Sequence, residues 1–183
     1  MLTELARTTL KLLQFRAGPQ DFPFSLQATR TVVMVAVAVS YFQYRLTLPP
    51  LPALVHALVS LGVMAALTWQ LLNWRRVGNR AQQTINSLFA TGSALTILLL
   101  PLLTAVAPQI IKMAETPDTA TTEALPPLPM LGLLALSLWS LAVSANIYRH
   151  ALNLPLMMGL LASLFTALVS VSVAGTISGL LID

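Results

Sequence analysis

Five long apolar segments, joined by short polar or proline-rich connections, constrain the fold of this 183-residue chain more than any other feature. They cover residues 29–46, 51–74, 84–106, 130–148 and 155–182. Because a helix rises about 1.5 Å per residue, roughly 20 apolar residues cross the ~30 Å hydrocarbon core of a bilayer. The sequence therefore predicts an all-α polytopic membrane protein, with a five-helix membrane domain over residues 29–183.

The composition agrees with a surface that faces lipid. Only 9% of the residues are charged, 56% are hydrophobic and the mean hydropathy is +0.79, whereas soluble domains carry about 25% charged residues. The chain has no cysteine, which excludes disulfides and thiol chemistry. Its pI of about 10.1 would fit a nucleic-acid binder, but the ten basic residues stand at the ends of apolar runs and form no dense cluster. We therefore expect anionic lipid, and no nucleic acid, as the partner of these charges.

The first apolar segment is the shortest. Arg30 and Arg45 bracket only the stretch TVVMVAVAVSYFQY. Arginine side chains at both ends of a span can extend to the headgroups, which allows a short segment to cross. We expect this segment to be a transmembrane helix.

The basic residues also predict an orientation. With the N-terminus in the cytoplasm and five crossings, only Arg45 and Lys112 fall outside, and the other eight fall inside: Arg7, Lys11, Arg16, Arg30, Arg75, Arg76, Arg80 and Arg149. Cytoplasmic loops are enriched in Lys and Arg, so this distribution favours five crossings. It places the C-terminal end in the periplasm.

Residues 1–28 read as a cytoplasmic amphipathic helix followed by a connector. One polar stripe runs over the first 16 or so residues, at spacings of three or four: Glu4, Arg7, Thr8, Lys11 and Gln14. Apolar residues fill the rest: Leu2, Leu5, Ala6, Leu10, Leu12 and Leu13. Gly18 and Pro19 are expected to end the helix. We predict that it lies flat in the membrane interface; the alternative is a helix docked on other helices of the same protein.

Two further features concern the third span and the loop after it. Pro101 is expected to kink the span, because its ring clashes with the preceding turn. Residues 114–129 carry Glu115, Asp118 and Glu123 among several prolines. They predict an acidic external loop.

Polar residues gather at the cytoplasmic ends of the predicted spans. We take eight of them as a hypothetical contact site for a lipid headgroup or a protein partner: Arg75, Arg76, Arg80, Gln83, Asn86, Asn146, Arg149 and His150. Arginine offers phosphate a planar fork of donors. The alternative is ordinary topology anchoring combined with helix capping.

The fifth span carries small residues at spacings of three and four, which predict a helix-packing face: Ser163, Ala167, Ser170, Ala174, Gly175, Ser178 and Gly179. Small residues let helix backbones approach closely in a membrane. The partner helix belongs either to the same chain or to a second copy in a homo-oligomer.

The sequence contains no pattern typical of an enzyme. No phosphate loop, zinc-binding HExxH or GxSxG motif occurs, and no Asp or Glu lies within a span before the terminal Asp183. His56 is the one histidine inside a span and has no acidic neighbour in sequence, so we read it as interfacial or locally hydrogen-bonded. We expect no catalysis, no metal and no cofactor.

Two segments carry a resemblance to a known family. NRAQQTINSLFATGSAL, residues 79–95, and ANIYRHALNLPLMMGLL, residues 145–161, resemble small bacterial inner-membrane proteins of the Yip (Ypt-interacting protein) superfamily. The resemblance implies a cytoplasmic N-terminal segment, five closely packed spans and a bacterial inner-membrane location. Eukaryotic members are associated with membrane trafficking and small GTPases, but no functional residue carries over to this chain.

The sequence thus favours a non-enzymatic membrane protein that acts through lipid or protein contacts, as an accessory subunit or scaffold of a membrane complex. The alternative is a small transporter or lipid-handling protein that uses the cytoplasmic polar residues as a headgroup site.

Overall fold

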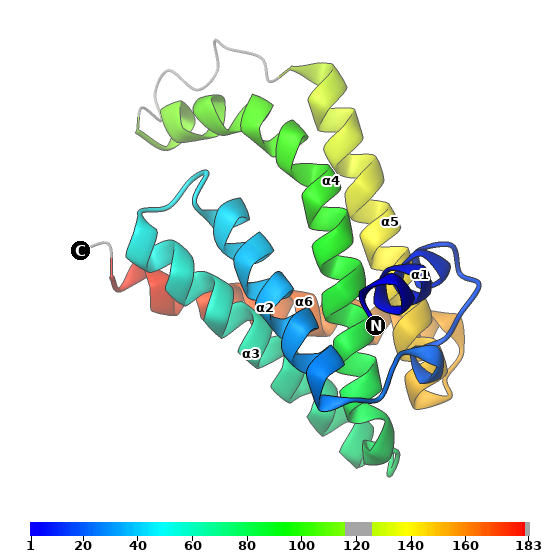
Figure 1. Ribbon diagram of the computed structural model, residues 1–183. Coiled ribbons are helices and arrows are strands. Elements are labelled where there is room, and N and C mark those ends of the chain that lie inside the picture. The colour runs from blue at the N-terminus through cyan, green and yellow to red at the C-terminus, as the bar shows by residue number, and fades with distance from the viewer. Residues whose placement is uncertain (116–125, 182–183) are drawn as a thin grey trace.

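Helices make up nearly all of the chain in the computed structural model, which describes residues 1–115 and 126–181 (Figure 1). The α-helices are α1 (Leu2–Leu13), α2 (Leu26–Tyr44), α3 (Pro50–Trp74), α4 (Ala81–Glu115), α5 (Pro127–Leu152) and α6 (Leu156–Gly179). Two 3-10 turns, η1 (Pro19–Asp21) and η2 (Gly78–Arg80), precede α2 and α4. The predicted all-α class is confirmed. The acidic loop lies largely at 116–125, outside the described residues.

Four helices of the described chain, α3, α4, α5 and α6, are long and apolar enough to cross a membrane. They indicate a multi-pass membrane protein. Helix α2 has 19 residues and is not among these four. Its crossing, and with it the count of five spans, stays a prediction.

The helix ends follow from local backbone chemistry. Three helices begin at or directly after a proline: α3 at Pro50, α5 at Pro127 and α6 after Pro155. Proline is tolerated there because the first N–H groups of a helix have no acceptor within the helix. Ser25 begins α2, because its hydroxyl accepts a hydrogen bond from the Ala28 N–H at 3.1 Å. Asn153 ends α5 in the left-handed conformation, with φ 52°, and the Leu154 N–H then bonds back to the Arg149 carbonyl.

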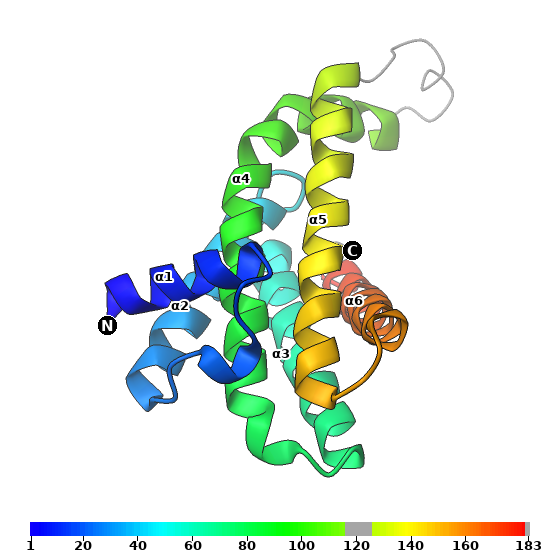
Figure 2. The ribbon, with the colours of Figure 1, turned by 90° about the vertical axis from the view of Figure 1, so that its right-hand side faces the viewer.

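Helix α1 ends earlier than Gly18 and Pro19 suggested. It stops at Leu13, and Phe15 adopts a left-handed φ of 60° while the Arg16 N–H bonds to the Lys11 carbonyl. Figure 2 shows α1 lying across α4, and α1 also contacts α5. Leu5, Thr8 and Leu12 are buried there, so Thr8, assigned above to the polar stripe, belongs to the packed face. One face of α1 therefore docks on the same chain, while its position at a membrane surface stays a prediction.

Two groups of contacts define two ends of the packed helices. At one, the Arg80 end, the α3–α4 connection meets the α5–α6 turn, since the Arg80 guanidinium lies 3.1 Å from the Asn153 amide oxygen. At the other, the His56 end, the start of α3 meets the finish of α6, since His56 Nδ1 lies 3.0 Å from the Ser178 hydroxyl. Helices α3 and α6 are therefore antiparallel, whereas α6 crosses α5 at a steep angle (Figure 2).

Helix α4 bends in its second half, which contains Pro101 and Pro108 (Figure 1). Each proline lacks an N–H and so breaks the i→i−4 ladder. The Thr104 hydroxyl donates to the Pro101 carbonyl at 2.8 Å. The bend predicted from Pro101 is therefore present, and it turns the last part of α4 away from the axis of its first part.

Tight packing concentrates toward the Arg80 end. Leu12 of α1, Phe22 after η1, Leu72 of α3, and Ile147 and Tyr148 of α5 are each at most 1% exposed. By contrast, apolar side chains such as Leu131, Leu138 and Leu168 are more than half exposed. A surface of this kind is the one that a lipid environment solvates.

Candidate functional site

The polar residues of the Arg80 end are used mainly to join separate parts of the chain. The Arg80 guanidinium donates to the Asn153 amide oxygen at 3.1 Å and to the His150 carbonyl at 3.4 Å. These bonds connect the start of α4 with the α5–α6 turn, about 70 residues later in the sequence. Arg80 thus has a structural partner within the chain.

Gln83 and Asn86, one turn apart on α4, hold the N-terminal segment. The Gln83 amide donates to the Gln20 carbonyl at 3.0 Å and to the Phe22 carbonyl at 2.9 Å. The Asn86 amide donates to the Thr29 hydroxyl at 2.8 Å, and the Gln82 amide donates to the same oxygen at 2.9 Å. The connector and the start of α2 are therefore fixed to one face of α4.

The eight predicted contact residues divide into two groups. Arg80, Gln83 and Asn86 make the internal bonds described above, and Asn146 is buried in α5. Arg75, Arg76, Arg149 and His150 remain exposed. The Asn86 Oδ1 and the Ser87 hydroxyl, both buried, have no hydrogen-bond partner among the described residues. The structure thus brings the set to one end without forming a single polar pocket.

The face of α6 that packs within the chain is shifted from the predicted one. Ser163, Ser170, Ala174 and Ser178 are buried, whereas Ala167 and Gly175 are exposed and Gly179 is only partly covered. Gly159 and Thr166 complete the buried row. A Cβ on Gly159 would run into the Ala145 carbonyl, but one on Gly175 or Gly179 would meet nothing in the described chain.

A buried tyrosine that sequence reasoning missed joins three helices. The Tyr148 hydroxyl of α5 lies 2.7 Å from the Thr68 hydroxyl of α3, and the Thr166 side chain of α6 lies within hydrogen-bonding reach of it. All three residues are at most 1% exposed. A tyrosine near the end of a span reads in sequence as an interfacial anchor, so only its burial reveals this role.

At the His56 end, His56 joins three helices, as Tyr148 does near the Arg80 end. Its Nδ1 pairs with Ser178 of α6, and its ring lies 4.1 Å, centre to centre, from the Tyr44 ring of α2. The opposite ring nitrogen has no hydrogen-bond partner in the described structure. His56 is thus locally hydrogen-bonded, and it links α3 with α2 and α6.

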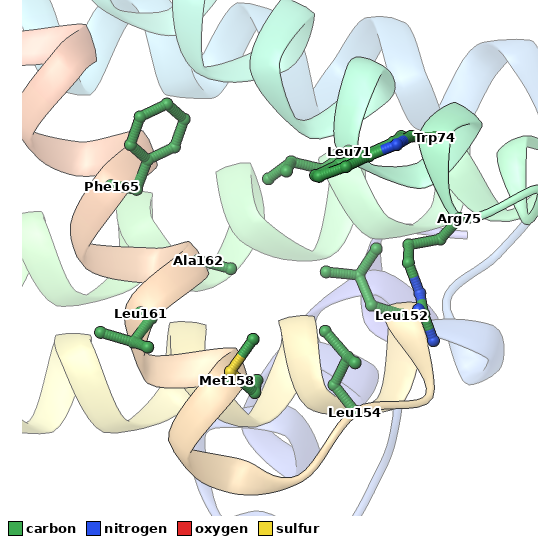
Figure 3. Close-up of a pocket in the computed structure, with 9 residues that line it drawn as sticks. All are labelled: Leu71, Trp74, Arg75, Leu152, Leu154, Met158, Leu161, Ala162 and Phe165. Atoms are coloured by element: carbon green, nitrogen blue, oxygen red, sulfur yellow. The ribbon is translucent and has the colours of Figure 1, made fainter.

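A groove of about 570 Å³ opens between the end of α3 and the start of α6. It is lined almost wholly by apolar side chains, namely Leu71, Trp74, Leu152, Leu154, Met158, Leu161, Ala162 and Phe165, with Arg75 as the one charged residue. Figure 3 shows Arg75 at one side of the groove, near Leu152 and Leu154, and Phe165 at the far side. Arg75 belongs to the predicted contact set, but no sequence pattern indicated the groove.

Within the described residues, no three His, Asp or Glu side chains come close enough together to hold a metal ion. The described residues that line the groove include no carboxylate and no histidine. Its chemistry is that of apolar contact beside one cation, which suits binding more than proton transfer.

Comparison of the chain with protein-family models, curated proteins and solved structures finds no match. The fold, the internal polar contacts and the groove are therefore the basis for a functional proposal.

Proposed function

We propose that this chain is a five-span protein of the bacterial inner membrane that acts without catalysis, through contacts with lipids and membrane proteins. The proposal rests on one observation: the polar side chains of the Arg80 end mostly make hydrogen bonds within the chain. Gln83, Asn86 and Arg80 are committed to bonds within the chain, while the long helices present apolar side chains outward. Such a molecule is suited to act through its apolar surface, because its polar groups are used to hold the helices together.

The position of α2 supports a fifth crossing. Thr29, near its start, contacts Asn86 at the Arg80 end, and Tyr44, its last residue, contacts His56 at the other end. The helix therefore extends between the same two ends as the apolar helix α3 beside it. Nineteen residues rise about 28 Å, close to the thickness of the hydrocarbon core, and Arg30 and Arg45 flank the apolar part.

The contacts of the N-terminal segment support a cytoplasmic N-terminus. Gln83 binds the carbonyls of Gln20 and Phe22, so residues 19–22 share the Arg80 end with Arg75, Arg76 and Arg149. A concentration of arginines is typical of the cytoplasmic side. With five crossings, the end of α6 then lies on the periplasmic side.

Within this proposal we favour an accessory subunit or scaffold of a membrane complex. Leu131, Leu134 and Leu138 of α5 are each more than half exposed and recur at helical spacing. A row of this kind can pack against lipid or against a helix of another protein.

Purification tests the subunit role. The tagged protein would be extracted in a polymer that retains native lipid, and its co-purifying proteins quantified against the same preparation from cells that express the untagged chain. The proposal predicts a protein present in a stoichiometric amount. A lone monomer or a homo-oligomer in repeated preparations would contradict it.

The groove beside Arg75 favours a second candidate, a lipid-handling protein or small transporter. An apolar groove with one cation at its side matches an amphipathic anion better than a polar solute. Movement of a labelled phospholipid between the leaflets of reconstituted vesicles would support this candidate. An unchanged leak rate relative to empty vesicles would contradict it.

A further inference from the structure

We propose that the groove formed by the end of α3, the α5–α6 turn and the start of α6 binds one acyl chain of an anionic phospholipid, whose phosphate pairs with Arg75. The inference rests on the proposed role in lipid contact and names the lipid class and the site. It concerns a residue whose guanidinium has no partner among the described residues, unlike that of Arg80.

The two ends of the groove fall at the levels of the headgroups and of the hydrocarbon core. Helix α3 has 25 residues and is about 37 Å long, so a crossing α3 places Arg75, the residue after its last turn, at the level of the headgroups. Phe165, at the other side of the groove, lies nine residues into α6, or roughly 14 Å along it. The groove thus runs from the headgroup level into the hydrocarbon, beside a charge at its polar end.

The shape also fits a single chain. Leu71 of α3 and Ala162 of α6 point toward the space between the helices (Figure 3). Ala162 leaves room where a larger side chain would fill the groove, and Met158 supplies an adaptable wall. The volume of about 570 Å³ lies within the ordinary range for ligand sites in proteins.

The charge around the groove selects an anion. Arg75 lines it, and Arg76, Arg80 and Arg149 belong to the same end of the molecule. No Asp or Glu occurs between Asp21 and Glu115 or between Glu123 and Asp183, so α3, the α5–α6 turn and α6 up to Gly179 contain no acidic residue. A phosphate at Arg75 would find no competing carboxylate on the elements that form the groove.

Trp74 provides the test, because it lines the groove beside Arg75. Trp69→Phe and Trp139→Phe would leave Trp74 as the single tryptophan of the full chain, reconstituted in nanodiscs of a zwitterionic lipid. Brominated phosphatidylglycerol and brominated phosphatidylcholine, at the same low mole fraction, would then quench its fluorescence. We expect the anionic lipid to quench with about fivefold higher apparent affinity, the effect of one basic residue at a membrane surface.

Two pairs of variants separate a site from a diffuse surface effect. Arg75→Ala is expected to abolish the preference and Arg75→Lys to retain part of it, while Arg76→Ala, the adjacent exposed arginine outside the groove, should leave it intact. Ala162→Phe should reduce quenching by either lipid, whereas Ala167→Phe, on the exposed side of α6, should not.

Equal quenching by the two lipids, equal effects of the Arg75 and Arg76 variants, or unchanged quenching in Ala162→Phe would each overturn the inference. The measurement uses purified protein with no partner, so it is independent of the co-purification test. If quenching shows no lipid in the groove but a stoichiometric protein co-purifies, only the lipid site is refuted. If quenching shows lipid in the groove but no protein co-purifies, only the subunit role is refuted.

Discussion

The hydroxyl oxygen of Tyr148 in α5 lies 2.7 Å from the hydroxyl oxygen of Thr68 in α3, at a point where both side chains are fully enclosed. The Thr68 hydroxyl also lies 2.7 Å from the Met64 carbonyl of its own helix and donates to it, so the tyrosine is the donor of the bond between the helices. Thr166 of α6 approaches the same tyrosine. The Tyr148 phenol therefore links α3, α5 and α6 near the Arg80 end.

Removing this phenol oxygen should destabilise the fold without changing its shape. Tyr148→Phe is expected to lower the free energy of unfolding by about 1 kcal/mol, the usual scale for a hydrogen bond between membrane helices. Tyr41→Phe is the matched control, because Tyr41 is partly exposed and its hydroxyl makes no hydrogen bond within the described residues. Denaturation with sodium dodecyl sulfate would measure both, and equal effects would contradict a special role for Tyr148.

Loss of the Gln83 amide should free the N-terminal segment. Gln83→Ala removes two bonds to the carbonyls of Gln20 and Phe22, so we expect trypsin to cleave after the exposed Arg16 about tenfold faster, a change of roughly 1.4 kcal/mol. Gln70→Ala, on the exposed face of α3, should have no effect. Cleavage rates would be followed by mass spectrometry, and an unchanged rate in Gln83→Ala would show that other contacts hold the segment.

The close approach of α5 and α6 depends on Gly159. A methyl group there would meet the Ala145 carbonyl and the Arg149 backbone, so Gly159→Ala should destabilise the protein by about 1–3 kcal/mol. Gly175→Ala meets nothing in the described chain and should change stability by less than about 1 kcal/mol. Thermal unfolding in one detergent would compare the two. The prediction fails if Gly175→Ala proves the more damaging change.

The sequence predicts the helices well because their length and composition are set by the membrane. The apolar runs near residues 51–74 and 130–148 lie within α3 and α5, whose starts are marked by Pro50 and Pro127. Left-handed Phe15 and Arg76 end helices without a glycine, which is why the end of α1 was misplaced.

The contacts between helices could not be predicted from the length and composition of the apolar segments. Hydropathy indicates that a residue lies in a span but not how the helix is rotated. It therefore could not show that Tyr148 is buried between helices, or that Ala167 is exposed on this chain. The groove could not be predicted from the sequence for a similar reason. Its walls, such as Leu71 and Met158, are ordinary apolar residues that form a groove only through the arrangement of α3 and α6 in the fold.

In the proposed topology, five helices cross the membrane and residues 19–22 lie on the same side as the α3–α4 connection. The chain has no cysteine, so single cysteines report cleanly on location. Three exposed positions serve this purpose: Gln20→Cys before α2, Thr47→Cys between α2 and α3, and Asn79→Cys between α3 and α4.

Labelling of these three variants with a membrane-impermeant maleimide in intact spheroplasts is the most direct measurement. We predict that the cysteine at position 47 reacts at once, and that those at positions 20 and 79 react only after the membrane is permeabilised. Reaction of the cysteines at positions 20 and 47 from the same side of the membrane would mean that α2 does not cross, and would contradict the five-span account.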